Sequence, residues 1–268
     1  MGKPLMTVLQ ELLQDLADET DAFLGLLEQV GATRFSLVTP AAPWTVTDTV
    51  AHLAFFDDQQ RFAILDPVGF ERSVEAAMTL DRSLVDIARD TYVDEAPDEV
   101  VEWFETSRAD LLKTFHECDP GIRISWFGPS MGVASAVTAR LMETWAHGVD
   151  LSDTIDVAPV ASARLRHIAL LTHRAMPFAY GAHGLQLPLE PLRFELTGPD
   201  GELWSFGDDD ATSIVLGSAL ELCLVATQRR HVADTSLVAT SEEAAHYLSI
   251  AQAFAGAPGQ GRQPRGVK

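Results

Sequence analysis

The sequence predicts an α+β protein, in which an antiparallel four-helix bundle precedes a smaller α/β domain. Apolar side chains recur at helical spacing over the first 150 residues, whereas alternating apolar runs around turn signals appear only after Pro159. One longer crossover between the expected helices fits an antiparallel bundle. We therefore expect the bundle over residues 1–156, the α/β domain over 157–255 and a disordered, Gly/Pro-rich tail over 256–268.

Four strong helices are expected in the first part, with start and stop signals that are legible in the sequence. Gly31 follows the last periodic residue of the first helix, and Pro67 stops the second. Thr45 and Asp48 have the spacing of a capping box, which marks where the second helix begins. The expected ranges are Leu5 to Val30, Thr45 to about Leu65, Pro97 to about Phe115, and Ala134 to about Thr154. Residues 69–92 look helical but less regular, and DPGIRISWFGPSMG is expected to be an extended loop.

The second part mixes both kinds of element. The stretch LRFELTGPDGELWSFG has two alternating apolar runs around Pro199-Asp200-Gly201, which is a hairpin signal, and TSIVLG is expected to be a third strand. Three helices are also expected, over Ala161 to about Tyr180, Gly217 to Arg230, and Ser241 to Phe254.

Composition limits the classes of partner and the cellular compartment. The formal net charge of −20 disfavours binding to nucleic acids and to anionic membranes, because both carry negative charge. The longest apolar run, Ile214 to Ala226, is too short to span a bilayer, and the N-terminus lacks the apolar run of a signal peptide. Cys118 and Cys223 are expected to be free thiols. We therefore expect a cytoplasmic protein, and its oligomeric state, monomer or homodimer, stays open.

One group of polar residues indicates a metal site. His52 lies in the apolar stripe of PWTVTDTVAHLAFFDDQQ, while Glu143 and His147 in RLMETWAHGVD are four residues apart and share a helix face. A helix offers two ligands to one metal ion at this spacing, and a neighbouring helix adds the third. The spacing alone is a weak signal, since it recurs at Glu242 and His246. The alternative is a hydrogen-bonded Glu–His pair with His52 separate from it.

Two of these segments carry a family resemblance. PWTVTDTVAHLAFFD, followed about ninety residues later by ETWAHGVD, resembles the DinB-like helical bundle proteins, and within them the mycothiol-dependent maleylpyruvate isomerase branch of actinobacteria. The resemblance implies that His52, Glu143 and His147 hold a divalent metal. DGELWSF and GSALELCLVATQRR resemble the small α/β domain of these isomerases, and ALELCLVATQRRHVADTSLVATSEEA is closer still to an uncharacterised actinobacterial group of metal-binding proteins. TQRR replaces the usual ending of that segment; Arg229 best matches the arginine that assists catalysis in these isomerases, and Arg230 is the alternative.

This resemblance implies a reaction. A small thiol, mycothiol, would lose its proton at the metal and attack a small electrophilic, acidic substrate, giving an isomerase or an S-transferase. Arg229 or Arg230 would bind the acidic group. Zinc best suits two nitrogens and one carboxylate, although nickel, iron or manganese could also bind. Two alternatives stay open: a metallohydrolase on the same three ligands, or a non-catalytic protein that binds a metal or another ligand.

Three further residues adjoin the expected ligands in sequence. Asp150 follows His147 by three residues and could orient its ring, or could simply cap the helix or face solvent. Trp44 and Trp145 could line a pocket for the thiol, or could be ordinary core residues.

Overall fold

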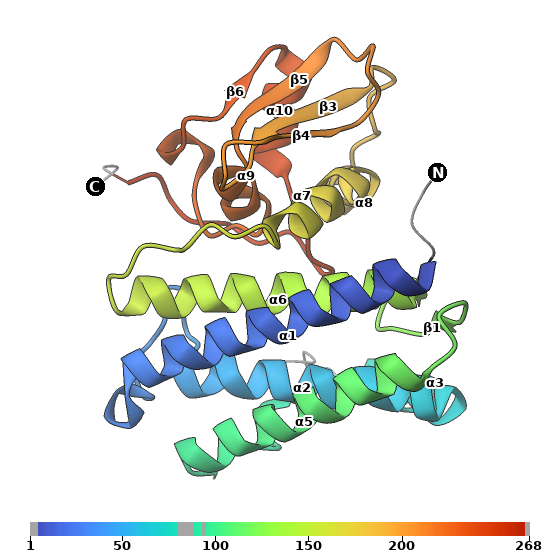
Figure 1. The fold of residues 1–268 in the computed structure, drawn as a ribbon, viewed down its shortest axis with the longest axis vertical. Helices are drawn as coiled ribbons and strands as arrows, with labels where there is room; N and C mark the ends of the chain where they lie inside the picture. The colour runs from blue at the N-terminus through green and yellow to red at the C-terminus, as the bar shows by residue number, and fades with distance from the viewer. Residues whose placement is uncertain (1–4, 80–87, 93–94, 266–268) are drawn as a thin grey trace. The chain divides into compact units, whose positions relative to one another are not determined.

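Four long helices form the bundle in the first part of the chain: α1 (Leu5–Val30), α2 (Val46–Leu65), α5 (Pro97–Glu117) and α6 (Val133–Thr154) (Figure 1). The computed structural model describes residues 5–79, 88–92 and 95–265. The chain divides into two units, residues 1–159 and 160–268. Within the first, α2 packs mainly along α5, and α6 packs mainly along α1. The predicted α+β class is confirmed, and these four helices closely match their expected ranges.

The start of α2 is fixed by the capping box that the sequence predicts. The Asp48 amide donates to Thr45 Oγ1 at 3.1 Å, and the Thr45 amide donates to Asp48 Oδ2 at 2.8 Å. The Tyr92 hydroxyl donates to the other oxygen of Asp48 at 3.1 Å. Because two free amides at the helix end are satisfied, α2 begins at a defined residue, two turns before His52.

The connections within the bundle differ in part from the prediction. Helix α3 (Pro67–Met78) begins at Pro67, because proline is well suited to the first turn of a helix. The remainder of the irregular segment includes residues 80–87 and 93–94, which lie outside the described residues. The expected extended loop contains a short hairpin, in which β1 (Arg123–Ile124) pairs antiparallel with β2 (Met131–Gly132).

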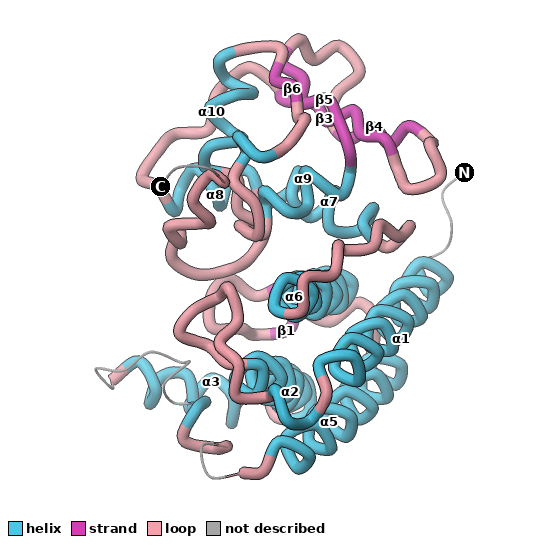
Figure 2. The backbone as a smooth tube through the Cα atoms, turned by 90° about the vertical axis from the view of Figure 1, so that its left-hand side faces the viewer, coloured by secondary structure: helices cyan, strands magenta, loops and turns pink. Residues whose placement is uncertain are grey.

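The second unit contains a four-stranded sheet in the order β4-β3-β5-β6, drawn in magenta in Figure 2. The predicted hairpin is confirmed as β3 (Leu192–Thr197) and β4 (Leu203–Phe206), and its turn contains Gly201 at φ 80°. Strand β5 (Ser213–Ser218) pairs in parallel with β3, and β6 (Val238–Ala239) pairs antiparallel with β5. Three helices contact these strands: α7 (Leu165–Arg174), α9 (Ala219–Ala226) and α10 (Glu242–Ile250).

The helices of the second unit are shorter than predicted. The expected helix over 161–180 is two helices, α7 (Leu165–Arg174) and α8 (Met176–Ala182), because Pro177 can occupy only the first turn of a helix. Helix α9 (Ala219–Ala226) begins later than expected because Gly217 belongs to β5, and α10 spans Glu242–Ile250. The short strand β6 was not predicted.

Both cysteines are free thiols. Cys118 is half-buried at the end of α5, and Cys223 is fully buried in α9. Burial raises the pKa of each thiol above its ordinary value. Among the described residues, no helix is both long and apolar enough to cross a membrane.

Candidate metal centre

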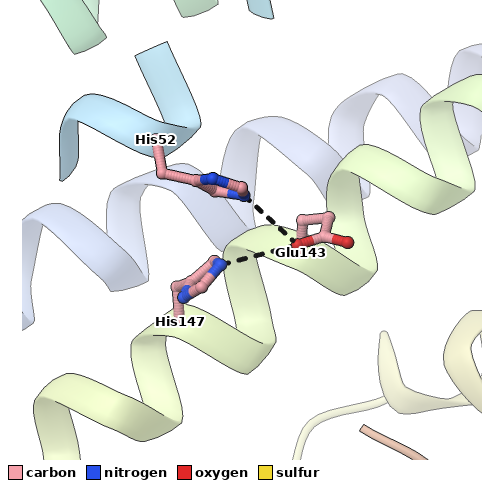
Figure 3. Close-up of side chains that lie close together, drawn as sticks. All are labelled: His52, Glu143 and His147. Carbon is pink, nitrogen blue, oxygen red and sulfur yellow. Dashed lines mark ion pairs between the residues drawn. The ribbon is translucent and has the colours of Figure 1, made fainter. Parts of the chain in front are cut away.

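The side chains of His52, Glu143 and His147 converge on one point between α2 and α6 (Figure 3). Oε2 of Glu143 lies 3.8 Å from Nε2 of His52 and 3.5 Å from Nε2 of His147. All three potential ligand atoms lie within 4.8 Å of one another. The structure therefore brings together the three residues that the sequence singles out, and the hydrogen-bonded Glu–His pair does not stand apart from His52.

Local structure explains this convergence. Glu143 and His147 project from one face of α6 because they are one helical turn apart. Trp44, which lies just before the capping box of α2, covers the two imidazoles: its ring centroid is 4.7 Å from that of His52 and 5.6 Å from that of His147. On the next turn of α2, Phe56 lies 4.7 Å from His52. The two imidazoles thus have aromatic neighbours.

Burial and mutual contact set the charges of the site. Burial lowers the pKa of His52 to about 4, so its imidazole is neutral at physiological pH. Burial alone would raise the pKa of Glu143, but hydrogen bonds with His147 and His52 outweigh it and hold that pKa well below its usual value. The site therefore offers a neutral imidazole and a carboxylate at neutral pH, the protonation states that metal binding requires.

Asp150 supports His147 from behind. Its carboxylate is fully buried, and Oδ2 lies 3.2 Å from Nδ1 of His147. A carboxylate at Nδ1 stabilises a proton there, so that with a metal ion bound the Nε2 lone pair of His147 would be available as a ligand. This contact is the arrangement that commonly orients a metal-binding histidine.

The spacing of the three donors fits a small divalent cation. With bonds of about 2.1 Å in tetrahedral geometry, the ligand atoms around zinc lie about 3.4 Å apart. The two N–O separations in the structure, 3.5 and 3.8 Å, are close to that value. Two imidazoles and one carboxylate also leave a coordination position for a further ligand, which is typical of catalytic rather than structural zinc sites.

The family model for the mycothiol maleylpyruvate isomerase N-terminal domain matches residues 16–152, which include all three residues of the site. The chain belongs to this family. Two uncharacterised proteins from two strains of Mycobacterium tuberculosis are similar to it: each is 39% identical over 248 residues, which cover 92% of this chain and 96% of the relative.

Solved structures of the mycothiol maleylpyruvate isomerase family have the same fold. The crystal structure of the mycothiol-dependent maleylpyruvate isomerase matches with a TM-score of 0.51, and that of a variant with one histidine replaced by alanine matches with 0.53. In both comparisons the identity is 19%, and the match covers 82% of this chain and 89% of the other.

Beside the site, this member of the family has a buried charged network that the sequence analysis missed. Asp57 is fully buried on α2 and accepts hydrogen bonds from Arg108 Nε at 2.7 Å and Arg140 Nε at 2.8 Å. A signal for it exists, because Val50, Leu53 and Asp57 have the spacing of one helix face. An acidic residue on an otherwise apolar face is expected to have a buried partner.

The sequence analysis also singled out Trp145, Arg229 and Arg230. Trp145 is buried on α6, and the ring contacts described for the two imidazoles involve Trp44 instead. Arg229 and Arg230 belong to the second unit, where Arg229 Nη1 donates to the Thr227 carbonyl at 2.7 Å and Arg230 Nη1 donates to the Arg229 carbonyl at 2.6 Å. Their catalytic role stays a prediction.

Proposed function

We propose that this protein is a metal-dependent enzyme that uses mycothiol to isomerise, or to add the thiol to, a small electrophile with a conjugated double bond. The observation that carries the proposal is the convergence of His52, Glu143 and His147 in a chain of the maleylpyruvate isomerase family. Mycothiol is proposed as the thiol because the matching family and the similar solved structures are mycothiol-dependent isomerases.

The three side chains would hold the cation as two neutral nitrogen donors and one anionic oxygen donor. Zinc fits this set best, and nickel, iron or manganese could replace it. When bound, the metal would supply a Lewis acid that lowers the pKa of a thiol placed beside it. Asp150 would keep His147 in its metal-binding tautomer, and Trp44 would restrict the access of water to both imidazoles.

The proposed reaction conserves the thiol when it ends in isomerisation. The thiolate sulfur bonds to the β-carbon of the double bond, and the π-electron pair moves onto the conjugated carbonyl oxygen. Rotation about the resulting single bond and expulsion of the same thiolate then give the other geometric isomer. If the enolate is protonated and the C–S bond persists, the product is a thioether. Arg229 or Arg230 is the proposed partner for an acidic group on the substrate.

Two measurements test this proposal. Purified wild-type protein should contain about one divalent metal ion per chain. His52→Ala and Glu143→Ala should each abolish metal binding, whereas the control His116→Ala, which replaces an exposed histidine, should retain the metal. The wild type should also isomerise maleylpyruvate, or consume a related unsaturated keto acid, only when mycothiol is present. A metal-free wild type would refute the metal site, and turnover of equal rate without mycothiol would refute the role of the thiol.

A further inference from the structure

The two helices that carry the candidate ligands are not each other's main packing partners. Helix α2, which provides His52, packs mainly along α5, whereas α6, which provides Glu143 and His147, packs mainly along α1. A metal site tolerates errors of only a few tenths of an ångström in the positions of its ligands. The separation of α2 from α6 must therefore be set by something more specific than broad apolar contact.

Arg140 spans this gap with two hydrogen bonds that both run from α6 to α2. Its Nε donates to Asp57 Oδ1 at 2.8 Å, and its Nη2 donates to the Leu53 carbonyl at 3.2 Å. Leu53 directly follows His52 in the chain, and Arg140 lies about one turn before Glu143 on α6. Both hydrogen bonds therefore attach close to a candidate ligand.

The chemistry of the contact makes it rigid. Arg140 is 3% exposed and Asp57 is fully buried, so water does not compete for these hydrogen bonds. A guanidinium is planar and donates along fixed directions, so two hydrogen bonds to acceptors on successive turns of α2 restrain both the distance and the rotation of that helix. A lysine ammonium is a single point of charge and cannot form the same fork.

We infer that Arg140 is a positioning residue: it holds α2 against α6 at the separation that lets His52 and Glu143 bind one metal ion. This inference rests on the proposed metal site. An apolar side chain could also fill the space between the two helices, so packing alone does not explain why a buried arginine lies there. Positioning of the metal ligands gives the charged network a role.

Arg108 provides a matched control. It binds the same carboxylate, with Nε at 2.7 Å and Nη2 at 3.3 Å from Asp57, and it is equally buried. It projects from α5, where none of the three candidate ligands lies, and it also donates to Thr20 on α1 and Thr144 on α6. Its replacement removes a buried ion pair of the same kind, together with the indirect link from α2 through Arg108 to Thr144, but it leaves both direct hydrogen bonds of Arg140 in place.

The test compares Arg140→Met, Arg140→Lys and Arg108→Met in the full chain. Each metal-free protein is titrated with Co²⁺, and the dissociation constant and the visible absorption of the bound ion are recorded beside the urea midpoint. Arg140→Met should weaken Co²⁺ binding about tenfold or more and change the absorption spectrum, which reports coordination geometry. Arg140→Lys should also weaken binding, whereas Arg108→Met should lower the urea midpoint but keep the wild-type spectrum.

The outcomes separate the two proposals. If wild-type protein binds no Co²⁺, the metal site itself is wrong and the role of Arg140 falls with it. If wild-type protein binds Co²⁺ and both Arg140 variants match its affinity and spectrum, only the positioning role is refuted. Equal weakening in Arg108→Met would also refute it, because any loss of buried charge would then have the same effect. Should Arg140→Met fail to fold, Arg140→Lys decides alone.

Discussion

Metal-free protein should lose stability on acidification because of His52. Burial lowers the pKa of this imidazole from an ordinary value of 6.5 to about 4 in the folded state. In the unfolded chain His52 gains a proton below about pH 6.5, whereas in the folded chain it stays neutral until about pH 4. Above pH 6.5 both states are neutral and the residue adds no pH dependence. Below it, protonation favours the unfolded state increasingly until pH 4.

The size of the effect follows from the two pKa values. At about 1.4 kcal/mol per pH unit, the full loss is about 3 kcal/mol, of which about 2 kcal/mol falls between pH 7 and pH 5. The His52 side chain is only 15% exposed, so screening by solvent reduces the estimate little. Glu143 acts at lower pH: its folded-state pKa lies well below the usual value of 4.5, so the stability it contributes is lost mainly below pH 4.5.

Urea unfolding of chelator-treated protein at pH 7 and pH 5 measures this difference. Wild-type protein should lose about 2 kcal/mol more than His52→Gln over that interval, and the control His116→Gln, which removes an exposed imidazole from α5, should behave as wild type. Proton NMR of the imidazole gives the midpoint directly. A His52 midpoint near pH 6.5, or an undiminished pH dependence in His52→Gln, would refute the reasoning.

Three shorter predictions concern other parts of the structure. Asp150→Asn should weaken metal binding about 10- to 100-fold in a chelator competition assay, since it removes the carboxylate 3.2 Å from His147; an unchanged affinity would contradict the tautomer argument. Trp44→Phe should remove most of the fluorescence change on Co²⁺ addition, because this ring lies over both imidazoles, whereas Trp204→Phe in the second unit should retain it. Phe104→Ala should lower the free energy of unfolding by about 3–5 kcal/mol, because this ring is fully buried against α1; a loss below about 1 kcal/mol would show that the core is not tightly packed there.

The helices of the bundle could be predicted because their signals are local. Thr45 and Asp48 satisfy each other's amides whatever the remainder of the chain does, and Gly31 reaches φ 76° just after α1 ends. The elements of the second unit are harder to predict from the sequence. Pro177 divides what apolar spacing alone presents as one helix, and the two-residue strand β6 is too short to show alternation.

Part of the candidate site could likewise be predicted from the sequence, and part could not. Glu143 and His147 could be found from their spacing on one helix, and His52 from its place in an apolar stripe. The partners of Asp57 could not be found, because Arg108 and Arg140 lie 51 and 83 residues away in sequence and are brought together only by the packing of three helices. Charged residues are usually exposed, so sequence alone favours the surface for both arginines.

The state of the two cysteines has a practical consequence for the proposed chemistry. Because the pKa of each cysteine is raised, both side chains are protonated thiols near neutral pH, and the protein itself contains little nucleophilic thiolate. Any sulfur nucleophile observed during turnover should therefore come from the added small molecule. Brief treatment with iodoacetamide before the assay should leave turnover unchanged. The contribution of the added thiol can then be measured without a contribution from the protein's own cysteines.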